Sequence, residues 1–194
     1  TFAKGKVALL GDVEAALDAL QTQLPAIVLD SLREQVLRIK ALCEDIAKVE
    51  KRLGLVLKAD PAMQRIFEIP GVGLLTATAA IATMGQASSF KSGREFCAWL
   101  GLVPKQTGSG GKVRLGAISK RGDTYLRTLL VHGARSVLAN AKEPSAWQQA
   151  IKQRRPASVA VVAQAAKTAR IIWAVSAKEQ AYEGHHKSVR PVMA

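Results

Sequence analysis

The segment that most constrains the fold of this 194-residue chain is PKQTGSGGKVRLGAISKRG, at residues 104–122. It contains five glycines, and its apolar residues are too few and too scattered to form a core. It also carries five cations and no acid. Glycines leave backbone amides unshielded, and the cations supply a positive field, so we expect a basic loop that holds a polyanion backbone beside a serine hydroxyl. The core must therefore come from the flanking segments.

Two phosphate-binding motifs are excluded for this segment. A P-loop requires a glycine five residues before its Gly-Lys pair and a Ser or Thr directly after it, whereas Gln106 and Val113 stand at those places. A Rossmann fingerprint requires a preceding strand, and the helix-forming run FCAWLGL stands there instead. A solvated flexible loop remains the open alternative.

The flanking segments have the periodicity of helices. The chain is 48% hydrophobic but only 5% aromatic, and its many alanines and leucines favour helix over sheet. Helices are predicted at residues 11–24, 25–57, 61–85 (as a helix, turn and helix), 86–100, 125–138 and 157–177. We therefore predict an all-α fold with a helical arm at 1–60, a main domain at 61–183 and a flexible tail at 184–194.

The arm contains the longest periodic segment, from Pro25 to about Leu57. Its apolar residues follow alternating steps of three and four: Leu29, Leu32, Val36, Ile39, Cys43 and Ile46. This spacing is typical of a coiled-coil seam and predicts self-association into a dimer or tetramer. The alternative is one amphipathic helix packed on its own domain.

A tight turn, IPGVGL, joins two predicted helices at residues 69–74. This pattern is typical of a helix-hairpin-helix motif, in which Gly71, Val72 and Gly73 present backbone amides at a helix N-terminus. Such amides bind a DNA phosphate without reading sequence. In the alternative, the glycines only join two packed helices.

The net charge of +13 and the pI of about 10.1 indicate a nucleic acid or another anionic partner. The charge is unevenly distributed, because residues 11–60 are net −2 whereas residues 101–135 are net +6. The cations predicted to contact nucleic acid are Lys105, Lys112, Arg114, Lys120, Arg121 and Arg127.

No metal site, membrane span or signal peptide is predicted. Cys43 and Cys97 are too far apart for a zinc spacing and are expected to be buried free thiols. His185 and His186 are too few for a metal site, and His132 is interpreted as a packed helical residue that could lie near the glycine-rich segment. Because the chain begins at Thr1, we expect a fragment of a larger cytoplasmic protein.

Three segments resemble one protein family in the family's own order. They are IPGVGLLTATAAIATMG, the long run GLVPKQTGSGGKVRLGAISKRGDTYLRTLLVHGAR, and VVAQAAKTARIIWAVSAKEQAY, and they cover most of residues 61–182. The chain resembles the C-terminal transposase domain of the insertion-sequence one-hundred-and-ten group. These are DEDD-type recombinases related to the Piv DNA invertases.

This resemblance implies a DNA recombinase that exchanges strands through a phosphoserine intermediate and is guided by a structured bridge RNA. It places the nucleophile at Ser109; many relatives have a further serine just before it, where this chain has Gly108, and Ser119 is the second candidate. It also implies a separate RuvC-like acidic domain with Mg²⁺, so no cofactor is expected in this part and the fragment alone should be inactive. The expected location is the bacterial cytoplasm, on the nucleoid. The alternative is a non-catalytic helix-hairpin-helix module for nucleic-acid binding and oligomerisation.

Overall fold

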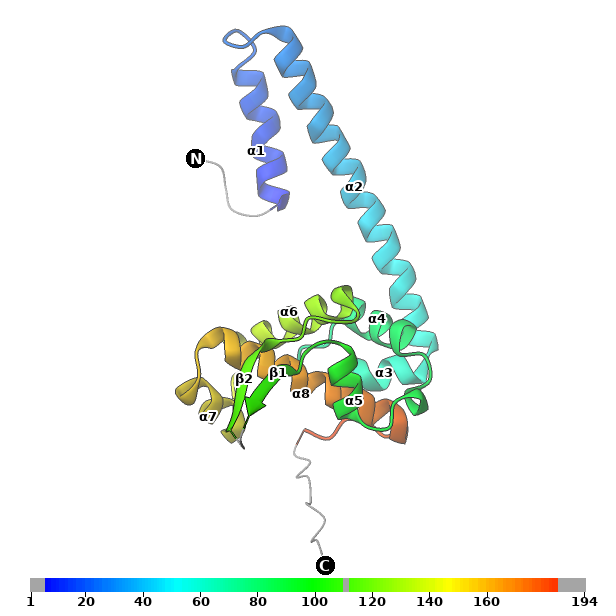
Figure 1. The fold of residues 1–194 in the computed structure, drawn as a ribbon. Coiled ribbons are helices and arrows are strands. Elements are labelled where there is room, and N and C mark those ends of the chain that lie inside the picture. The colour runs from blue at the N-terminus through cyan, green and yellow to red at the C-terminus, as the bar shows by residue number, and fades with distance from the viewer. Residues whose placement is uncertain (1–5, 110–111, 185–194) are drawn as a thin grey trace, which may run out of the picture. The chain divides into compact units, whose positions relative to one another are not determined.

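The computed structural model describes residues 6–109 and 112–184, which belong to two compact units, Thr1–Arg52 and Leu53–Ala194. The described residues are mostly helical, and the sheet among them has two strands (Figure 1), which confirms the predicted, mostly α fold. The units join inside a helix, a few residues before the boundary predicted at residue 60. Residues 185–194 of the predicted tail lie outside the described residues.

The first unit pairs helix α1 (Lys6–Ala19) with the first part of helix α2 (Ala26–Ala59) in an antiparallel arrangement (Figure 1). Helix α1 begins before the start predicted near Asp12. Leu10, which precedes Asp12, already packs on the apolar cluster between the helices, as does Val13. Two ion pairs cross between the helices, Arg33 with Asp18 and Lys40 with Glu14. These contacts fix α1 to one face of α2.

The predicted coiled-coil seam on α2 is divided between two faces. Leu29 and Val36 are buried against α1, in a cluster with Leu17. Leu32 and Ile39 are exposed, as is Ile46. Two of the predicted seam residues are therefore used within the chain, because α1 covers the face that holds them.

The second unit begins with the end of α2 and two short helices, α3 (Pro61–Phe67) and α4 (Leu74–Met84). Asp60 caps α3 by accepting hydrogen bonds from the amides of Ala62 and Met63. A proline at the first position of α3 lacks the N–H that would otherwise need a partner. The predicted helix, turn and helix are all present.

Four further helices complete this unit. They are α5 (Gly93–Trp99), α6 (Thr124–Asn140), α7 (Ala146–Arg154) and α8 (Ala157–Lys178), and a short 3₁₀ turn, η1 (Ala87–Ser89), precedes α5. Helix α8 is central, since α3, α5, α6, α7 and η1 all pack against it. Helix α7, which lies between two proline-containing loops, was not predicted.

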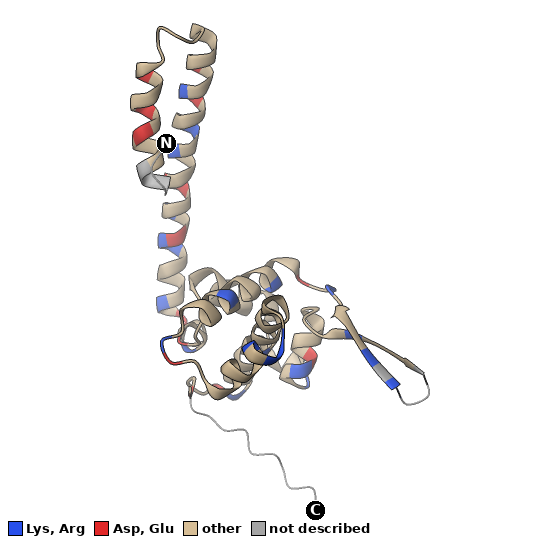
Figure 2. Cartoon of the chain, turned by 90° about the vertical axis from the view of Figure 1, so that its left-hand side faces the viewer, with Lys and Arg blue, Asp and Glu red and all other residues tan. Residues whose placement is uncertain are grey.

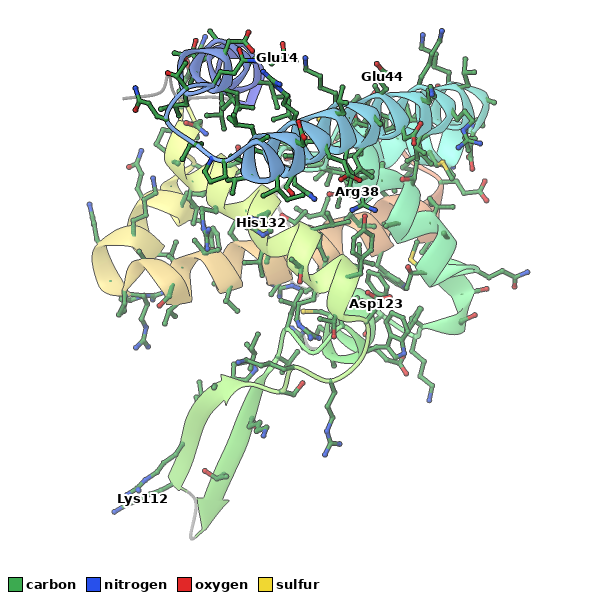
Figure 3. All side chains as sticks on the ribbon, turned by 90° about the horizontal axis from the view of Figure 1, so that it is seen from above. Glu14, Arg38, Glu44, Lys112, Asp123 and His132 are labelled. Atoms are coloured by element: carbon green, nitrogen blue, oxygen red, sulfur yellow. The ribbon has the colours of Figure 1, made fainter. Side chains whose placement is uncertain are left out.

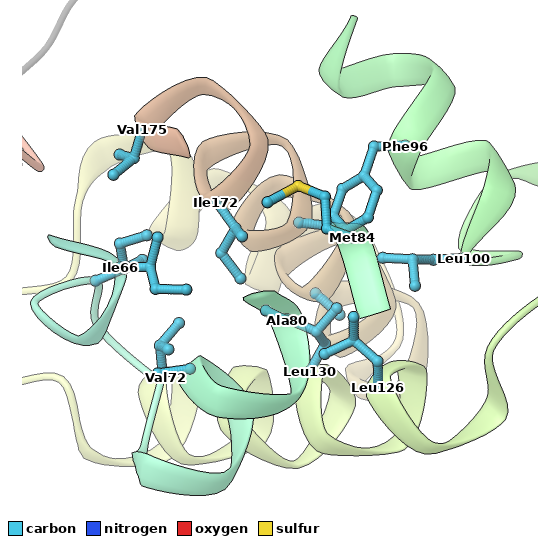
Figure 4. Close-up of a cluster of buried hydrophobic side chains, with 14 of the residues drawn as sticks. Ile66, Val72, Ala80, Met84, Phe96, Leu100, Leu126, Leu130, Ile172 and Val175 are labelled. Atoms are coloured by element: carbon cyan, nitrogen blue, oxygen red, sulfur yellow. The ribbon is translucent and has the colours of Figure 1, made fainter. Parts of the chain in front are cut away.

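The core of the second unit lies between these helices (Figure 4). Phe96, Leu126 and Ile172 come from three different helices and are completely buried. Helix α8 contributes the buried Ala165 and Ile172 to this core, whereas Trp99 of α5 stays 40% exposed while its ring stacks on Phe96.

Helix α8 is the one helix of the described residues that is long and apolar enough to cross a membrane. Its residues Ala165, Ala169 and Ile172 lie in the core, which accounts for its apolar composition. Cys97 is also buried in this core, and burial raises the pKa of its thiol, although Arg170 acts in the opposite direction. Cys43 is a free thiol too, and it is half-buried.

The glycine-rich segment corrects one predicted element. Instead of a loop, it forms an antiparallel hairpin of β1 (Pro104–Ser109) and β2 (Lys112–Ile118). The Gly-Gly dipeptide between two runs of alternating residues is a typical hairpin sequence. The glycines remain compatible with strands here because the hairpin does not have to build a core.

Candidate nucleic-acid interface

The hairpin extends away from the helices of its unit, with lysines and arginines along it (Figure 2). Its register pairs Thr107 with Arg114, and residues that pair directly across an antiparallel ladder lie on the same face. Lys105 joins this face, because a Cβ atom placed on Gly116 would lie 3.9 Å from the Lys105 Cβ. Lys112 lies two residues before Arg114 on the same strand, so it shares that face, near the far end of the hairpin (Figure 3). We call Lys105, Lys112 and Arg114 the basic face of the hairpin; all three are exposed.

The two candidate nucleophiles occupy opposite ends of the hairpin. Ser109 is the last residue of β1, and its Cα partner across the ladder is Lys112. Ser119 directly follows β2, and its amide donates to the carbonyl of Val103 at 2.9 Å. Of the two, Ser109 has the position next to the basic face, whereas Ser119 belongs to the attachment of the hairpin to the helices.

The hairpin base is fixed by a close backbone contact. Gly122 has a φ of +77°, and a Cβ atom there would lie 1.8 Å from the carbonyl oxygen of Trp99. Only glycine allows both this backbone conformation and this approach. The chain leaving β2 is therefore held directly against the end of α5.

Arg127 also stabilises the junction between the hairpin and the helices. Its Nη1 donates to the carbonyl of Leu100 at 2.9 Å and to the carbonyl of Arg121 at 3.0 Å, and its Nη2 donates to the Thr124 hydroxyl at 3.1 Å. These contacts give the half-buried guanidinium a structural role, and the nucleic-acid contact predicted for Arg127 stays a prediction.

Lys120 and Arg121 occupy the connection between β2 and α6, and both side chains are exposed. Lys120 has a positive φ of +55°, which is uncommon for a residue with a side chain. Asp123 follows and caps α6 by accepting from the amide of Leu126 at 2.6 Å. This connection therefore presents two cations while its only acid is bound to a helix N-terminus.

The three residues predicted to bind phosphate in the turn between α3 and α4 differ in their exposure. Val72 is buried in the core, and its amide donates to the carbonyl of Ile69 at 2.9 Å (Figure 4). Gly71 is half-buried against α6. Gly73 is exposed at the N-cap of α4, where no side chain caps the helix. Gly73 is thus the one of the three that is open to solvent, and its phosphate contact stays a prediction.

Three carboxylates of the second unit bind backbone amides. The ion pairs of Arg33 with Asp18, Lys40 with Glu14 and Lys48 with Asp45 lie within Thr1–Arg52. In the second unit Asp60 and Asp123 bind helix amides, and Glu95 accepts from the amide of Lys91. These carboxylates satisfy backbone donors, so they do not neutralise the basic face of the hairpin.

The structure does not bring the other candidate groups to the hairpin. His132 is exposed on α6, contrary to the packed position predicted for it, and lies well away from Lys112 (Figure 3). The turn between α3 and α4 packs on α6, where Gly71 contacts Gly133. The described residues contain no cluster of three His, Cys, Asp or Glu side chains, so they do not fit a Mg²⁺ or zinc site.

Sequence comparison relates this arrangement to mobile-element proteins. Over 183 residues the chain is 44% identical to a "Probable family 20 transposase" of Pseudomonas aeruginosa, a match that covers 92% of this chain and 54% of that protein. It is 44% identical over 143 residues to the "Transposase for insertion sequence element IS1111A" of Coxiella burnetii, covering 72% and 39% of the two chains. A third relative is the "Transposase for insertion sequence element IS1328" of Yersinia enterocolitica, 40% identical over 139 residues, with 70% and 42% covered.

The chain spans about half the length of the curated relatives it matches. The family described as "Transposase IS116/IS110/IS902 family" matches residues 63–150, a range that contains the turn between α3 and α4, the whole hairpin and the start of α7. Over residues 63–150 this chain therefore matches the IS116/IS110/IS902 transposase family.

Proposed function

We propose that this chain is the C-terminal part of a DNA transposase, and that Ser109 is the nucleophile that attacks the DNA backbone. The observation that supports this role is the pairing of Ser109 with Lys112 at the far end of a basic hairpin. A protein with this activity would act on DNA in the bacterial cytoplasm.

In the proposed step, the Ser109 oxygen forms a bond to the phosphorus of one phosphodiester. The bond from phosphorus to one DNA oxygen breaks, and that strand end leaves as a free hydroxyl after taking up a proton. The phosphoserine bond keeps the energy of the broken linkage for rejoining. Lys112 and Arg114 would stabilise the extra negative charge on the phosphoryl oxygens.

Activation of the serine would come from outside the described residues. A serine hydroxyl is a weak nucleophile until a base takes its proton. The exposed His132 lies away from Lys112, and no cluster of acidic side chains stands among the described residues. We propose that a RuvC-like acidic domain with Mg²⁺ completes the site, and that a structured bridge RNA selects the DNA partners.

We also propose that α2 joins two copies of the protein. Ile39, Leu42, Ile46 and Val49 continue the three–four spacing of a coiled coil, and all of them are exposed. They belong to the first unit and lie on a face that α1 does not cover. A second copy would bury this seam, which is shifted from the one predicted from the sequence.

The serine assignment is tested in the whole protein with Ser109→Ala. This change should abolish strand exchange and the covalent protein–DNA adduct seen after denaturation, while DNA affinity stays unchanged. Ser119→Ala is the matched control and should leave both products in place. An adduct that persists in Ser109→Ala would show that Ser109 is not the nucleophile. If neither serine matters and DNA is only bound, the chain is the non-catalytic binding module.

A further inference from the structure

We infer that a pocket in the second unit, with buried polar side chains in its wall, binds the base of a single unstacked nucleotide. The pocket has a volume of about 390 Å³. It lies between the turn that precedes α4, the end of α6, the start of α7 and one side of α8. The inference rests on the proposed function, because it assumes that this domain works on a nucleic acid.

The wall of the pocket contains buried polar side chains from two helices. Gln164 is 6% exposed and Thr168 is 4% exposed, and both belong to α8. Gln148 of α7 donates to the Gln164 carbonyl oxygen at 3.3 Å, and the Gln164 amide donates to the Thr168 hydroxyl at 3.3 Å. These contacts place the side-chain amides of Gln148 and Gln164 and the hydroxyl of Thr168 side by side.

This polar chain is only partly satisfied within the described residues. A glutamine amide offers two N–H donors and two acceptor lone pairs, and Gln164 makes one hydrogen bond with its nitrogen and one with its oxygen. Its remaining donor and acceptor lie in the plane of the same amide. The edge of a nucleobase presents the complementary pair, and amide side chains read bases in this way. A buried polar group without full partners costs stability, so a ligand that completes the bonds is favoured.

The rim of the pocket suits the phosphate of the same nucleotide. Lys142 and Glu143 are exposed at the rim, and Lys167 lines the wall. The Lys167 ammonium lies 4.6 Å from the centre of the Trp147 ring, which is outside the pocket lining. Burial lowers the pKa of Lys167, and the Arg170 charge acts in the same direction. The pocket lining thus carries two cations and one acid, a net charge of +1, which favours an incoming anion.

The position of the pocket links it to the proposed backbone contact. Ile69 and Pro70 line it, and the exposed Gly73 at the start of α4 follows three residues later. A strand whose phosphate rests on the α4 amides would have its neighbouring base close to this opening. The volume lies within the range of about 300–1,000 Å³ that is common for small-ligand pockets. Tyr182 at the edge adds an aromatic ring, of the kind on which unpaired bases stack.

The test is an NMR titration of the isotope-labelled 194-residue chain with the nucleoside monophosphates, in ribose and deoxyribose forms. At least one nucleotide should shift the side-chain amide signals of Gln148 and Gln164 saturably, with a dissociation constant on the order of 1 mM. Ribose 5-phosphate should not shift them. The sugar form that binds more tightly identifies the source as RNA or DNA.

Single-residue variants distinguish recognition of the base from electrostatic attraction of the whole nucleotide. Gln164→Leu keeps the side-chain volume and should weaken binding, followed at the Gln148 signal, by about tenfold. Lys142→Gln should also weaken nucleotide binding. Because Lys142 is exposed at the rim, we expect this change to leave folding intact. Gln153→Leu, an exposed residue of α7 outside the pocket, should change nothing.

Two results would overturn the inference. One is the absence of amide shifts with any nucleotide, and the other is an equal shift with ribose 5-phosphate, which would mean that the pocket attracts anions only. Binding of duplex DNA by the same samples is measured in parallel. If no nucleotide shifts the amide signals while duplex DNA still binds, only the inference about the pocket is refuted. If the wild-type chain does not bind duplex DNA, the proposed function is refuted.

Discussion

Gly71 and Gly133 are in backbone contact: a Cβ atom placed on Gly133 would lie 1.9 Å from the carbonyl oxygen of Gly71. The turn between α3 and α4 thereby packs directly on α6. Gly71 has a φ of +84° in this turn, and a Cβ on it would meet the side chain of Val137 at 2.6 Å. Both glycines are therefore required for packing, whether or not the turn also binds a phosphate.

Gly133→Ala should destabilise the second unit, because the added methyl group would collide with backbone that has no space to move. We expect a loss of at least about 2 kcal/mol, measured by urea unfolding of the chain. Gly54→Ala is the matched control, since no atom lies within 4 Å of the added Cβ in that helical position. It should stabilise the chain by about 0.5–1 kcal/mol. Equal effects of the two changes would contradict the packing role.

Arg127→Lys should lower stability without changing net charge. A lysine ammonium cannot both donate to the carbonyls of Leu100 and Arg121, as Nη1 does, and reach the Thr124 hydroxyl, as Nη2 does, so we expect a loss of about 2 kcal/mol. Thermal unfolding without nucleic acid measures this effect. Lys120→Gln, at an exposed position nearby, should stay within about 0.5 kcal/mol of the wild type. A normal unfolding temperature for Arg127→Lys would mean that the guanidinium is not structural.

Neutralising the basic face of the hairpin should reduce the salt dependence of DNA binding. With Lys105, Lys112 and Arg114 all changed to Gln, the slope of log affinity against log salt should fall by roughly two to three units. The control removes three cations from α2 instead, by changing Arg38, Lys51 and Arg52 to Gln. Because the net charge is the same in both variants, an equal fall in slope would show that the hairpin makes no particular contact with phosphates.

Self-association should depend on the exposed seam of α2. Changing Leu42 and Ile46 to Gln removes two apolar contacts that a second copy would bury, and association should weaken by about 3 kcal/mol, or more than 100-fold. Sedimentation equilibrium measures the association constant. Leu37→Gln is the control, because Leu37 is 64% exposed but stands outside the three–four spacing. Unchanged association in the double variant would exclude this seam.

The contribution of Cys97 to stability should depend on pH. Burial raises the pKa of its thiol above the usual 9.0, so the folded state favours the neutral form. This contribution is fully present below the usual pKa and decreases as pH rises past 9 toward the folded pKa. The stability difference between the wild type and Cys97→Ala should therefore shrink between pH 8 and pH 10 in urea titrations. A stability difference that stays constant from pH 8 to pH 10 would contradict the raised pKa of Cys97.

The sequence by itself predicted most of the helices. The apolar periodicity of α2, α6 and α8 is local information, because residues three and four apart lie on one helix face wherever the helix packs. The concentration of cations after residue 100 is likewise a property of the sequence alone. The resemblance to transposases also rests on continuous stretches of sequence, and it agrees with the family match over residues 63–150.

Only the tertiary structure decided how those parts are used. The glycine-rich segment pairs with itself as a hairpin, and Arg127 turns to carbonyls instead of outward. Helix α1 covers Leu29 and Val36, which leaves a different seam exposed on α2. Gln148 and Gln164, unremarkable in the sequence, meet at one pocket because α7 packs on α8. Periodicity defines which residues share a face, whereas long-range packing determines what covers that face.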